Sequence, residues 1–314
     1  MNFEFYKLVK EIEIDFENSL LKELNLVKIN GPLITISNSK MNDYLDGTTK
    51  PIEFSNHKGI QYEIVQSLAK WKRLFLNATN LKNQGICVEM NAIRPCEHID
   101  ETHSHHVRQW DWEFPLVYRQ RKIFTLIDFV KKIYECIKII AHKYNPKLYK
   151  ILPENIYFIH SSELKGMNSK EKEHIICKKH KAVCIIGIGG GKHDSRSPEY
   201  DDYSSEYSDE EWKYLKTQID YTITDFSTHR GMNCDILVWN PILNDSLELS
   251  SMGIRVTKDV LFNQLHDANL DLDKSSLYQK QILDNKCEDS IGGGIGISRL
   301  IMWVLQLKKI SDLD

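Results

Sequence analysis

Several features that define common protein classes are absent from this 314-residue chain. No apolar run approaches the roughly 20 residues that a membrane helix requires, and no secretion signal follows the N-terminal methionine. The seven cysteines are odd in number and lack C-x-x-C spacing, which argues against a disulfide framework and a zinc ribbon. Basic residues (41) do not exceed acidic residues (44), so no general attraction to nucleic acid is expected. We therefore expect a cytoplasmic protein with neither a membrane nor a nucleic-acid partner.

The composition is that of a folded globular chain. Hydrophobic residues make up 41% and charged residues 27%, enough to build a sizeable core beneath a charged surface. We find no internal repeat and no shift in composition that would mark a linker. Residues 1–314 are therefore expected to form a single catalytic domain.

The spacing of apolar residues predicts the order of the main elements. Apolar residues at steps of three and four predict long amphipathic helices over 5–24 and 126–143. Short strands are expected at 27–36 (broken at Gly31-Pro32), 62–65, 88–94, 109–114, 156–160, 182–187, 236–239 and 247–256. Because these strands do not alternate regularly with helices, the expected class is α+β, an antiparallel sheet flanked by helices. The acidic stretch 199–211 is expected to be a solvated surface loop.

A glycine-rich strand pattern, Gly292–Gly296, leads directly into an apolar helix that begins near Arg299. A helix N-terminus carries partial positive charge, so an arginine in its first turn favours a bound anion such as a phosphate. The alternative is a glycine-rich turn with a solvent-facing arginine. The other glycine run, Gly187–Gly191, lacks the spacing of a Walker motif, and neither run fits the Rossmann fingerprint.

Two further groups of polar residues suggest a site. If a hairpin turns near Pro241, Asp235 and Glu248 become cross-strand neighbours, and Mg²⁺ bridging phosphate oxygens would relieve their repulsion. The alternative is two carboxylates on a solvated strand face.

Arg94 and Gln109 are expected to face one pocket across a histidine-rich loop. Its His98, His103, His105 and His106, with Cys96, match no known metal-binding spacing, so we favour a loop that closes over a ligand.

Six segments form a specific pattern: SLAKWKR (67–73), AIRP (92–95), QWDWE (109–113), DILVWNP (235–241), ELSSMGIR (248–255) and IGGGIG (291–296). In these segments the chain resembles the ammonia-dependent asparagine synthetases, which are similar to the catalytic core of class II aminoacyl-tRNA synthetases. This resemblance implies a class II synthetase-like antiparallel sheet flanked by helices, in a homodimer with Pro32 at the interface.

The resemblance also implies a reaction and its residues. ATP activates the side-chain carboxylate of L-aspartate as β-aspartyl-AMP, and ammonia then displaces AMP to give L-asparagine. The implied catalytic residues are Asp43, Arg94 and Gln109. The implied ATP-binding residues are Arg94, Glu97, Arg299, Gly294 and Gly296. The implied substrate-binding residues are Ser67, Lys72, Asp111, Asp202, Ser250, Ser251 and Arg255, and the implied Mg²⁺ ligands are Asp235 and Glu248.

Other readings stay open at this point. An aspartyl- or asparaginyl-tRNA synthetase would share the core but normally adds an anticodon-binding domain, whereas here the motifs occupy nearly the whole chain. A non-catalytic paralogue would be expected to lose the charged site residues, which are present. Glutamine is disfavoured as nitrogen donor, because position 2 is Asn2 and no amidotransferase module is visible. Gln66, where the family usually has histidine, and the divergent stretch 204–229 depart from the pattern.

Overall fold

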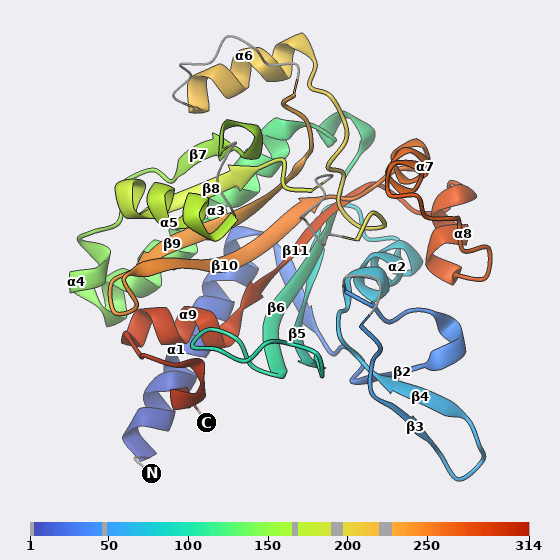
Figure 1. Ribbon diagram of the computed structural model, residues 1–314, viewed down its shortest axis with the longest axis horizontal. Coiled ribbons are helices and arrows are strands. Elements are labelled where there is room, and N and C mark those ends of the chain that lie inside the picture. Colours follow the sequence, from blue (N-terminus) through green and yellow to red (C-terminus); the bar gives the residue numbers. More distant parts are fainter. Residues whose placement is uncertain (1–2, 46–48, 165–168, 190–196, 220–227, 314) are drawn as a thin grey trace.

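The main sheet forms the frame of the computed structural model, which describes residues 3–45, 49–164, 169–189, 197–219 and 228–313. Its strand order is β1-β5-β6-β11-β10-β9-β8-β7 (Figure 1). Neighbouring strands run antiparallel, except for the parallel pairs β1–β5 and β7–β8 at the two ends. The bounds are β1 Leu26–Ile29, β5 Gly85–Ile93, β6 His106–Pro115, β7 Tyr157–His160, β8 Ala182–Ile186, β9 Asn233–Asn240, β10 Asp245–Ile254 and β11 Ser290–Gly296.

A small antiparallel sheet lies beside the main one, below α2 in Figure 1. Its strands are β2 Ile34–Ile36, β4 Gln61–Ile64 and β3 Glu53–Ser55, in the order β2-β4-β3. The backbone N–H of Val65, just after β4, bonds to the carbonyl of Leu33, and that of Ile93 bonds to the carbonyl of Val65. These two bonds tie the small sheet to β5 of the main sheet.

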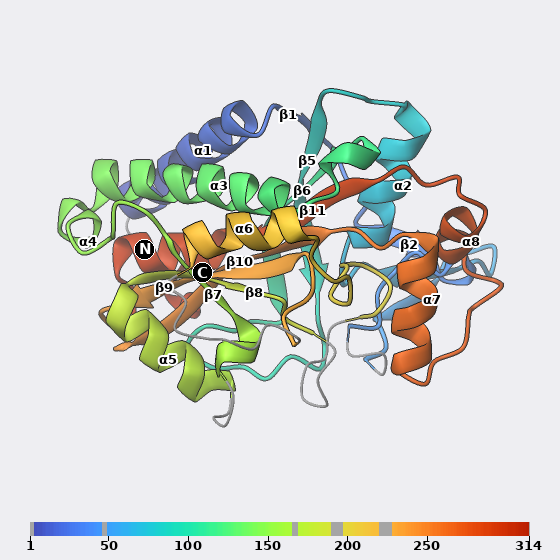
Figure 2. The same cartoon turned by 90° about the horizontal axis from the view of Figure 1, so that it is seen from above.

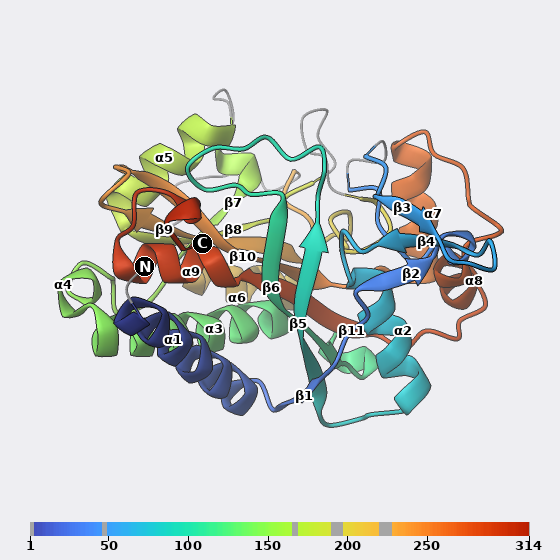
Figure 3. The ribbon, with the colours of Figure 1, turned by 90° about the horizontal axis from the view of Figure 1, so that it is seen from below.

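Helices cover both faces of the main sheet. α1 (Phe3–Glu23), α3 (Ile123–Tyr144) and α9 (Ile297–Leu305) pack together around the largest hydrophobic core, and α5 (Ser169–His180) packs on β8, β9 and β10 (Figures 2 and 3). The others are α2 Ala69–Thr79, α4 Pro146–Tyr149, α6 Asp209–Gln218, α7 Lys258–Asp267 and α8 Leu277–Leu283, with 3-10 turns at Ser37–Ser39, Tyr118–Gln120, Ser161–Leu164 and Ile310–Leu313. Within the described ranges, none of the helices combines the length and apolarity needed to cross a membrane.

The alternation of β6 separates the core from a polar face. Trp110 and Trp112 are fully buried toward the helices, where their rings lie 4.7 Å from that of Phe16 and 5.3 Å from that of Phe129. Since successive side chains of a strand point to opposite faces, the intervening Asp111 projects toward the other side of the sheet. The sheet thus has one apolar face under α1 and α3 and one polar face along β6.

Most of the predicted elements are confirmed, with boundaries that differ by a few residues. The prediction of a solvated loop over 199–211 is wrong. Asp202 and Glu211 are buried, and α6 begins inside this stretch behind a capping box in which Ser208 accepts from the Glu211 N–H. The acidic side chains have basic partners on the connection between β6 and α3: Asp202 pairs with Arg121, and Glu211 lies 3.5 Å from Lys122. The acidic charge of residues 199–211 therefore does not keep the whole stretch at the surface, because basic partners pair with its buried carboxylates.

His160, at the end of β7, is buried as a neutral ring. With its proton on Nε2 it donates to the Arg230 carbonyl (3.0 Å), and Nδ1 then accepts from the Ser162 N–H (3.1 Å). The His229 ring lies 4.4 Å away. The Ser162 hydroxyl lies 2.8 Å from Nδ1 as well. Burial, the largest effect, lowers the pKa of His160 to about 4.

This histidine predicts acid sensitivity. Because the folded pKa lies below the 6.5 that is usual for histidine, the unfolded chain binds the proton more readily between these values. We expect His160 to contribute stability that is fully present above pH 6.5 and declines as pH falls toward 4, about 2 kcal/mol of it lost by pH 5.

Urea unfolding at pH 7.5 and pH 5 measures this contribution. His160→Gln should reduce the pH dependence of the unfolding free energy by about 2 kcal/mol, whereas His57→Gln, at an exposed position, should leave it unchanged. An equal pH dependence in the wild type and His160→Gln would contradict the assignment.

Candidate active site

A cavity of about 610 Å³ opens on the polar side of the main sheet. Its walls come from the loop between β2 and β3, α2, the loop between β5 and β6, β6 itself, the segment 197–203, β10, β11 and the start of α9. Thirteen of the residues predicted from the sequence line it: Asp43, Ser67, Lys72, Arg94, Glu97, Gln109, Asp111, Glu248, Ser251, Arg255, Gly294, Gly296 and Arg299. The fold therefore brings together residues that are up to 256 positions apart in the sequence.

The glycines of β11 form the floor of this cavity. In the strand register, Gly292 lies opposite Glu113, Gly294 opposite Asp111 and Gly296 opposite Gln109. A Cβ atom at Gly292 would lie 1.9 Å from Glu113 Oε2, and one at Gly294 would lie 2.7 Å from Gln109 Oε1. These positions need glycine because the polar side chains of β6 lie directly over the backbone of β11.

Lys72 reaches this floor from α2. Its side chain is buried, forms an ion pair with Asp111, and donates to the carbonyl of Gly293 at 2.9 Å. A buried ammonium group needs partners of this kind, since burial without them would be costly. The structure thus holds Lys72 and Asp111, both predicted to contact substrate, as one pair on the cavity wall.

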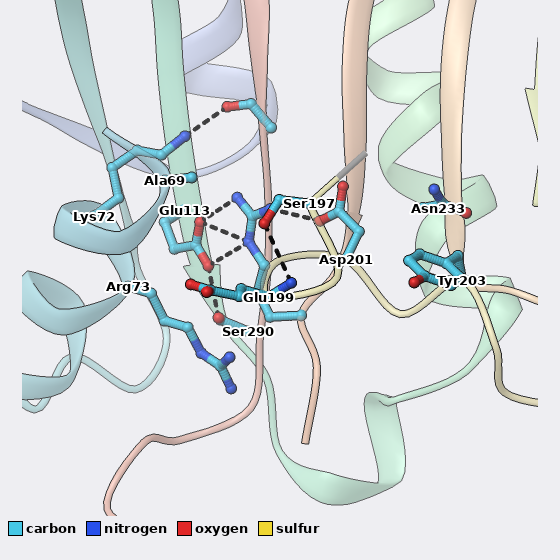
Figure 4. A network of polar contacts seen from close by, with 12 residues as sticks. Ala69, Lys72, Arg73, Glu113, Ser197, Glu199, Asp201, Tyr203, Asn233 and Ser290 are labelled. Carbon is cyan, nitrogen blue, oxygen red and sulfur yellow. Dashed lines mark hydrogen bonds and ion pairs between the residues drawn. The ribbon is translucent and has the colours of Figure 1, made fainter. Parts of the chain in front are cut away.

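Arg255 is the most heavily bonded cation of the site. Its Nε and Nη2 bind the Glu113 carboxylate at 2.7–3.1 Å, and Nη1 binds Asp201 at 2.5 Å (Figure 4). Ser290 donates to the other side of Glu113 at 2.6 Å. Burial, the largest single effect, raises the pKa of Glu113, but the charge and hydrogen bonds of Arg255, the charge of Lys72 and the Ser290 hydrogen bond together outweigh it, and the pKa is lowered. The carboxylate therefore stays ionised and fixes the guanidinium at the cavity wall.

Asp43 is buried at the edge of the cavity in a loop held by Gln66. The Gln66 amide donates to the carbonyls of Asp43 (2.8 Å) and Thr49 (3.1 Å). Burial, the largest effect, raises the pKa of Asp43 above its usual value against the opposing charge of Lys70. A raised pKa makes this carboxylate a better proton acceptor than an exposed aspartate.

Two arginines lie at the other end of the active-site cavity. Arg94 follows β5, donates to the carbonyl of Gln66 at 3.2 Å and lies 3.9 Å from Glu97. Arg299, in the first turn of α9, donates to the carbonyls of Thr102 (3.3 Å) and Glu248 (3.2 Å). Both side chains remain partly exposed, so their remaining N–H donors can bind an anion.

The histidine-rich loop lies between these arginines. His103 pairs with Asp100 at 2.7 Å, His105 bonds to the carbonyl of Arg94 and His106 to Asn91. Each of these rings has a local partner, and in the described part of the chain no group of three or more potential ligands could hold a metal ion. The loop contributes Thr102, His103, Ser104 and His106 to the cavity lining, as a ligand-facing loop would.

The predicted register of Asp235 and Glu248 is wrong. The turn occupies four residues, Pro241–Asn244, so Leu237 lies opposite Glu248, and a bulge after Glu248 puts Ser251 opposite Asp235. The two carboxylates are instead diagonal neighbours on one face. α5 adds Glu173 beside them, whose pKa is raised to about 7 by burial and then by the charges of Glu248 and Asp235.

Asp235 and Glu248 fit Mg²⁺ only together with a phosphate ligand, because the described residues form no three-membered metal-binding group. Mg²⁺ is usually held by one or two carboxylates plus substrate phosphates. Glu248 lines the cavity, and Asp235 lies on the same sheet face beyond it. Neighbouring negative charges that raise a carboxyl pKa are relieved by a cation, which makes this face suitable for one.

Three predicted residues stand apart from the described cavity lining. Asp202 is fully buried and accepts bonds from Ser205 and the Arg121 side chain, Ser250 donates to the Gly294 carbonyl at 3.0 Å, and Asp235 lies beneath α5. Sequence reasoning assigned no role to Glu113 or Tyr200, and of the neighbours Asp201 and Asp202 it chose Asp202, whereas Asp201 lines the cavity. The alternation Gln109, Asp111, Glu113 could have identified Glu113, since all three share one strand face.

Comparison with solved structures defines the fold class. Asparaginyl-tRNA synthetases of Entamoeba histolytica and Pyrococcus horikoshii, each in complex with asparaginyl-adenylate, match with TM-scores of 0.66 and 0.62 at 12% identity. The match covers 99% and 98% of this chain and 67% and 68% of theirs. The fold is therefore that of a class II synthetase core, as predicted.

Sequence comparison defines the family. The profile described as aspartate-ammonia ligase matches residues 4–314. Aspartate–ammonia ligases of Clostridium tetani and Bacillus cytotoxicus are 38% and 40% identical over 98% of this chain, and the matches cover 86% and 90% of theirs. The chain belongs to the aspartate–ammonia ligase family, which confirms the resemblance.

The Arg255 network predicts a large loss of stability on its disruption. Arg255→Met leaves Glu113 buried without its cation, and breaking such a pair costs about 3–5 kcal/mol. The double variant Arg255→Met/Glu113→Gln removes both charges and should recover part of this loss. Urea unfolding of the two single variants and the double variant measures the coupling; additive losses would contradict a direct interaction.

Proposed function

We propose that this chain is an aspartate–ammonia ligase that works through a β-aspartyl-AMP intermediate. The observation that carries the proposal is the family membership over nearly the whole chain, combined with a cavity that holds cations at both ends. A carboxylate is a poor electrophile, so its oxygen first attacks the α-phosphate of ATP and releases pyrophosphate. The nitrogen of ammonia then attacks the activated carbonyl, loses a proton and displaces AMP.

The two ends of the cavity suit different parts of the substrates. Lys72 and Arg255 supply positive charge at one end, where the carboxylates of aspartate would bind, with Ser67 and Ser251 beside them. Arg94 would stabilise the charge that develops on the α-phosphate, as preorganised donors do. Arg299 would bind the distal phosphates at the opposite end.

Asp235 and Glu248 would hold Mg²⁺ on the phosphate side. When bound, the ion neutralises charge on the phosphates and orients them for displacement. Glu248 already lies 3.6 Å from Arg299, so the two side chains would share the same phosphate region.

We further propose that residues 1–314 act as one catalytic domain, in a cytoplasmic homodimer. The strands of the main sheet come from positions 26 to 296, and cavity residues come from both ends of that range. Exposed apolar residues on the small sheet and the edge strand, among them Val27, Leu33, Ile34 and Ile36, offer a surface for a second copy. Sedimentation of the purified protein tests the dimer.

Product formation tests the reaction. With ATP, Mg²⁺ and aspartate, we expect AMP and asparagine when ammonium is supplied alone, and no more product when tRNA or glutamine is added. Formation of aspartyl- or asparaginyl-tRNA would instead favour an aminoacyl-tRNA synthetase. Absence of turnover with any acceptor would favour a non-catalytic paralogue.

Asp43 is proposed to deprotonate or position ammonia. At neutral pH ammonium lacks the lone pair needed for attack, and the buried carboxylate with its raised pKa can accept the proton. Asp43→Asn should lower amide formation by about a hundredfold while leaving aspartate-dependent pyrophosphate exchange nearly intact. An equal loss of both activities would assign Asp43 to the first step or to structure.

A further inference from the structure

A second cavity of about 620 Å³ lies beyond α2, on the other side from the active-site cavity. Residues of α2, α7, α8 and the chain segments next to β6 and β11 line it, and its described lining shares no residue with the first cavity. It is lined by Arg73, Asn77, Lys82, Pro115, Leu116, Val117, Tyr118, Thr257, Lys258, Ile282, Asn285, Lys286, Cys287, Glu288 and Asp289. The proposed function assigns no role to this cavity.

Arg73 is a buried cation in the wall of this second cavity. Only 2% of the residue is exposed, and Figure 4 shows its guanidinium below Glu113 and Ser290, with no dashed contact to either. Its Nη1 donates to the Tyr278 hydroxyl (3.4 Å) and its Nη2 to the Glu288 carbonyl (3.2 Å), both neutral acceptors. No carboxylate of the described residues forms an ion pair with it. A buried guanidinium normally has such a partner.

Arg73 has free donors of the kind that an anion site needs. Nε is buried and has no hydrogen-bond partner, and the described acceptors use only two of the five N–H groups. Nε and the neighbouring Nη form the planar fork that binds two oxygens of a carboxylate or phosphate. The unpartnered atom is therefore the one that such a ligand would use.

The remaining charges of the lining leave a positive balance. The carboxylate of Glu288 is paired with Lys82, and that of Asp289 lies 3.8 Å from Arg121. Lys258 has no ion pair within the described residues. It is the first residue of α7, whose N-cap is Thr257, so the positive end of the helix dipole faces the same cavity.

We propose that this cavity binds the oxyanion group of a small molecule, with Arg73 as the fork and Lys258 as the second cation. Carboxylic acids and phosphate compounds both carry this group, and the protein would recognise the negatively charged oxygens that they share. The site is separate from the substrate cavity and would be occupied independently of catalysis.

Two cysteines distinguish this site from the active site. Cys287 lines the second cavity and is partly exposed, whereas Cys96 lines the first and is exposed. We would follow alkylation of each thiol by N-ethylmaleimide with peptide mass spectrometry, adding inorganic phosphate or malonate, with chloride at equal ionic strength as reference. We expect phosphate, malonate or both to slow modification of Cys287 by about tenfold at saturation, and the more effective probe identifies the ligand class.

Matched variants assign any protection to the proposed cations. Lys258→Glu, at a partly exposed position, should raise the concentration for half-protection of Cys287 by about tenfold. Lys280→Glu makes the same charge change on α8 outside the lining and should leave protection unchanged. If Arg73→Met folds, it should abolish the protection of Cys287. If it does not fold, the result for Lys258→Glu tests the proposal by itself. Absence of protection by both probes, or equal protection in Lys258→Glu and the wild type, would overturn the proposal.

Discussion

The close approach of β6 to β11 is the constraint on which the active site depends. Glu113 lies over Gly292, and any side chain there would occupy the position of the carboxylate that fixes Arg255. Without that contact, Arg255 would lose its bidentate partner. The glycine run was interpreted from the sequence as a phosphate-binding feature. The structure gives a second and more direct reason for these glycines. A side chain at Gly292 or Gly294 would collide with the polar side chains of β6 that lie over β11.

The same packing explains why the cations of the site are held in place. Lys72 is paired with Asp111, Arg255 with Glu113 and Asp201, and Arg299 lies 3.6 Å from Glu248. Long side chains lose conformational freedom when they bind a ligand. Here the protein has already fixed them, so substrate binding would orient few additional groups. This is the preorganisation that electrostatic stabilisation of a transition state requires.

The sequence was sufficient for features set by local periodicity and insufficient for those set by distant partners. The long helices and most strands followed from apolar spacing, and the alternation of β6 correctly separates its polar and apolar faces. The register of Glu248 depended on the length of a turn and on a bulge, which apolar patterning does not encode. Asp202 could not be distinguished from Asp201 because only the fold shows that Arg121 takes the first and Arg255 the second.

Adjacent residues of α2 illustrate the limit of assigning roles from a motif. Lys72 and Arg73 belong to one segment that resembles the family, yet a helix turns by about 100° per residue, so neighbouring side chains leave in different directions. Lys72 enters the active-site cavity, whereas Arg73 lines the second cavity behind the helix. A match over the whole segment therefore cannot assign both residues to aspartate. The bonds that each cation makes in the folded chain decide its role, and those of Arg73 lead away from the substrate.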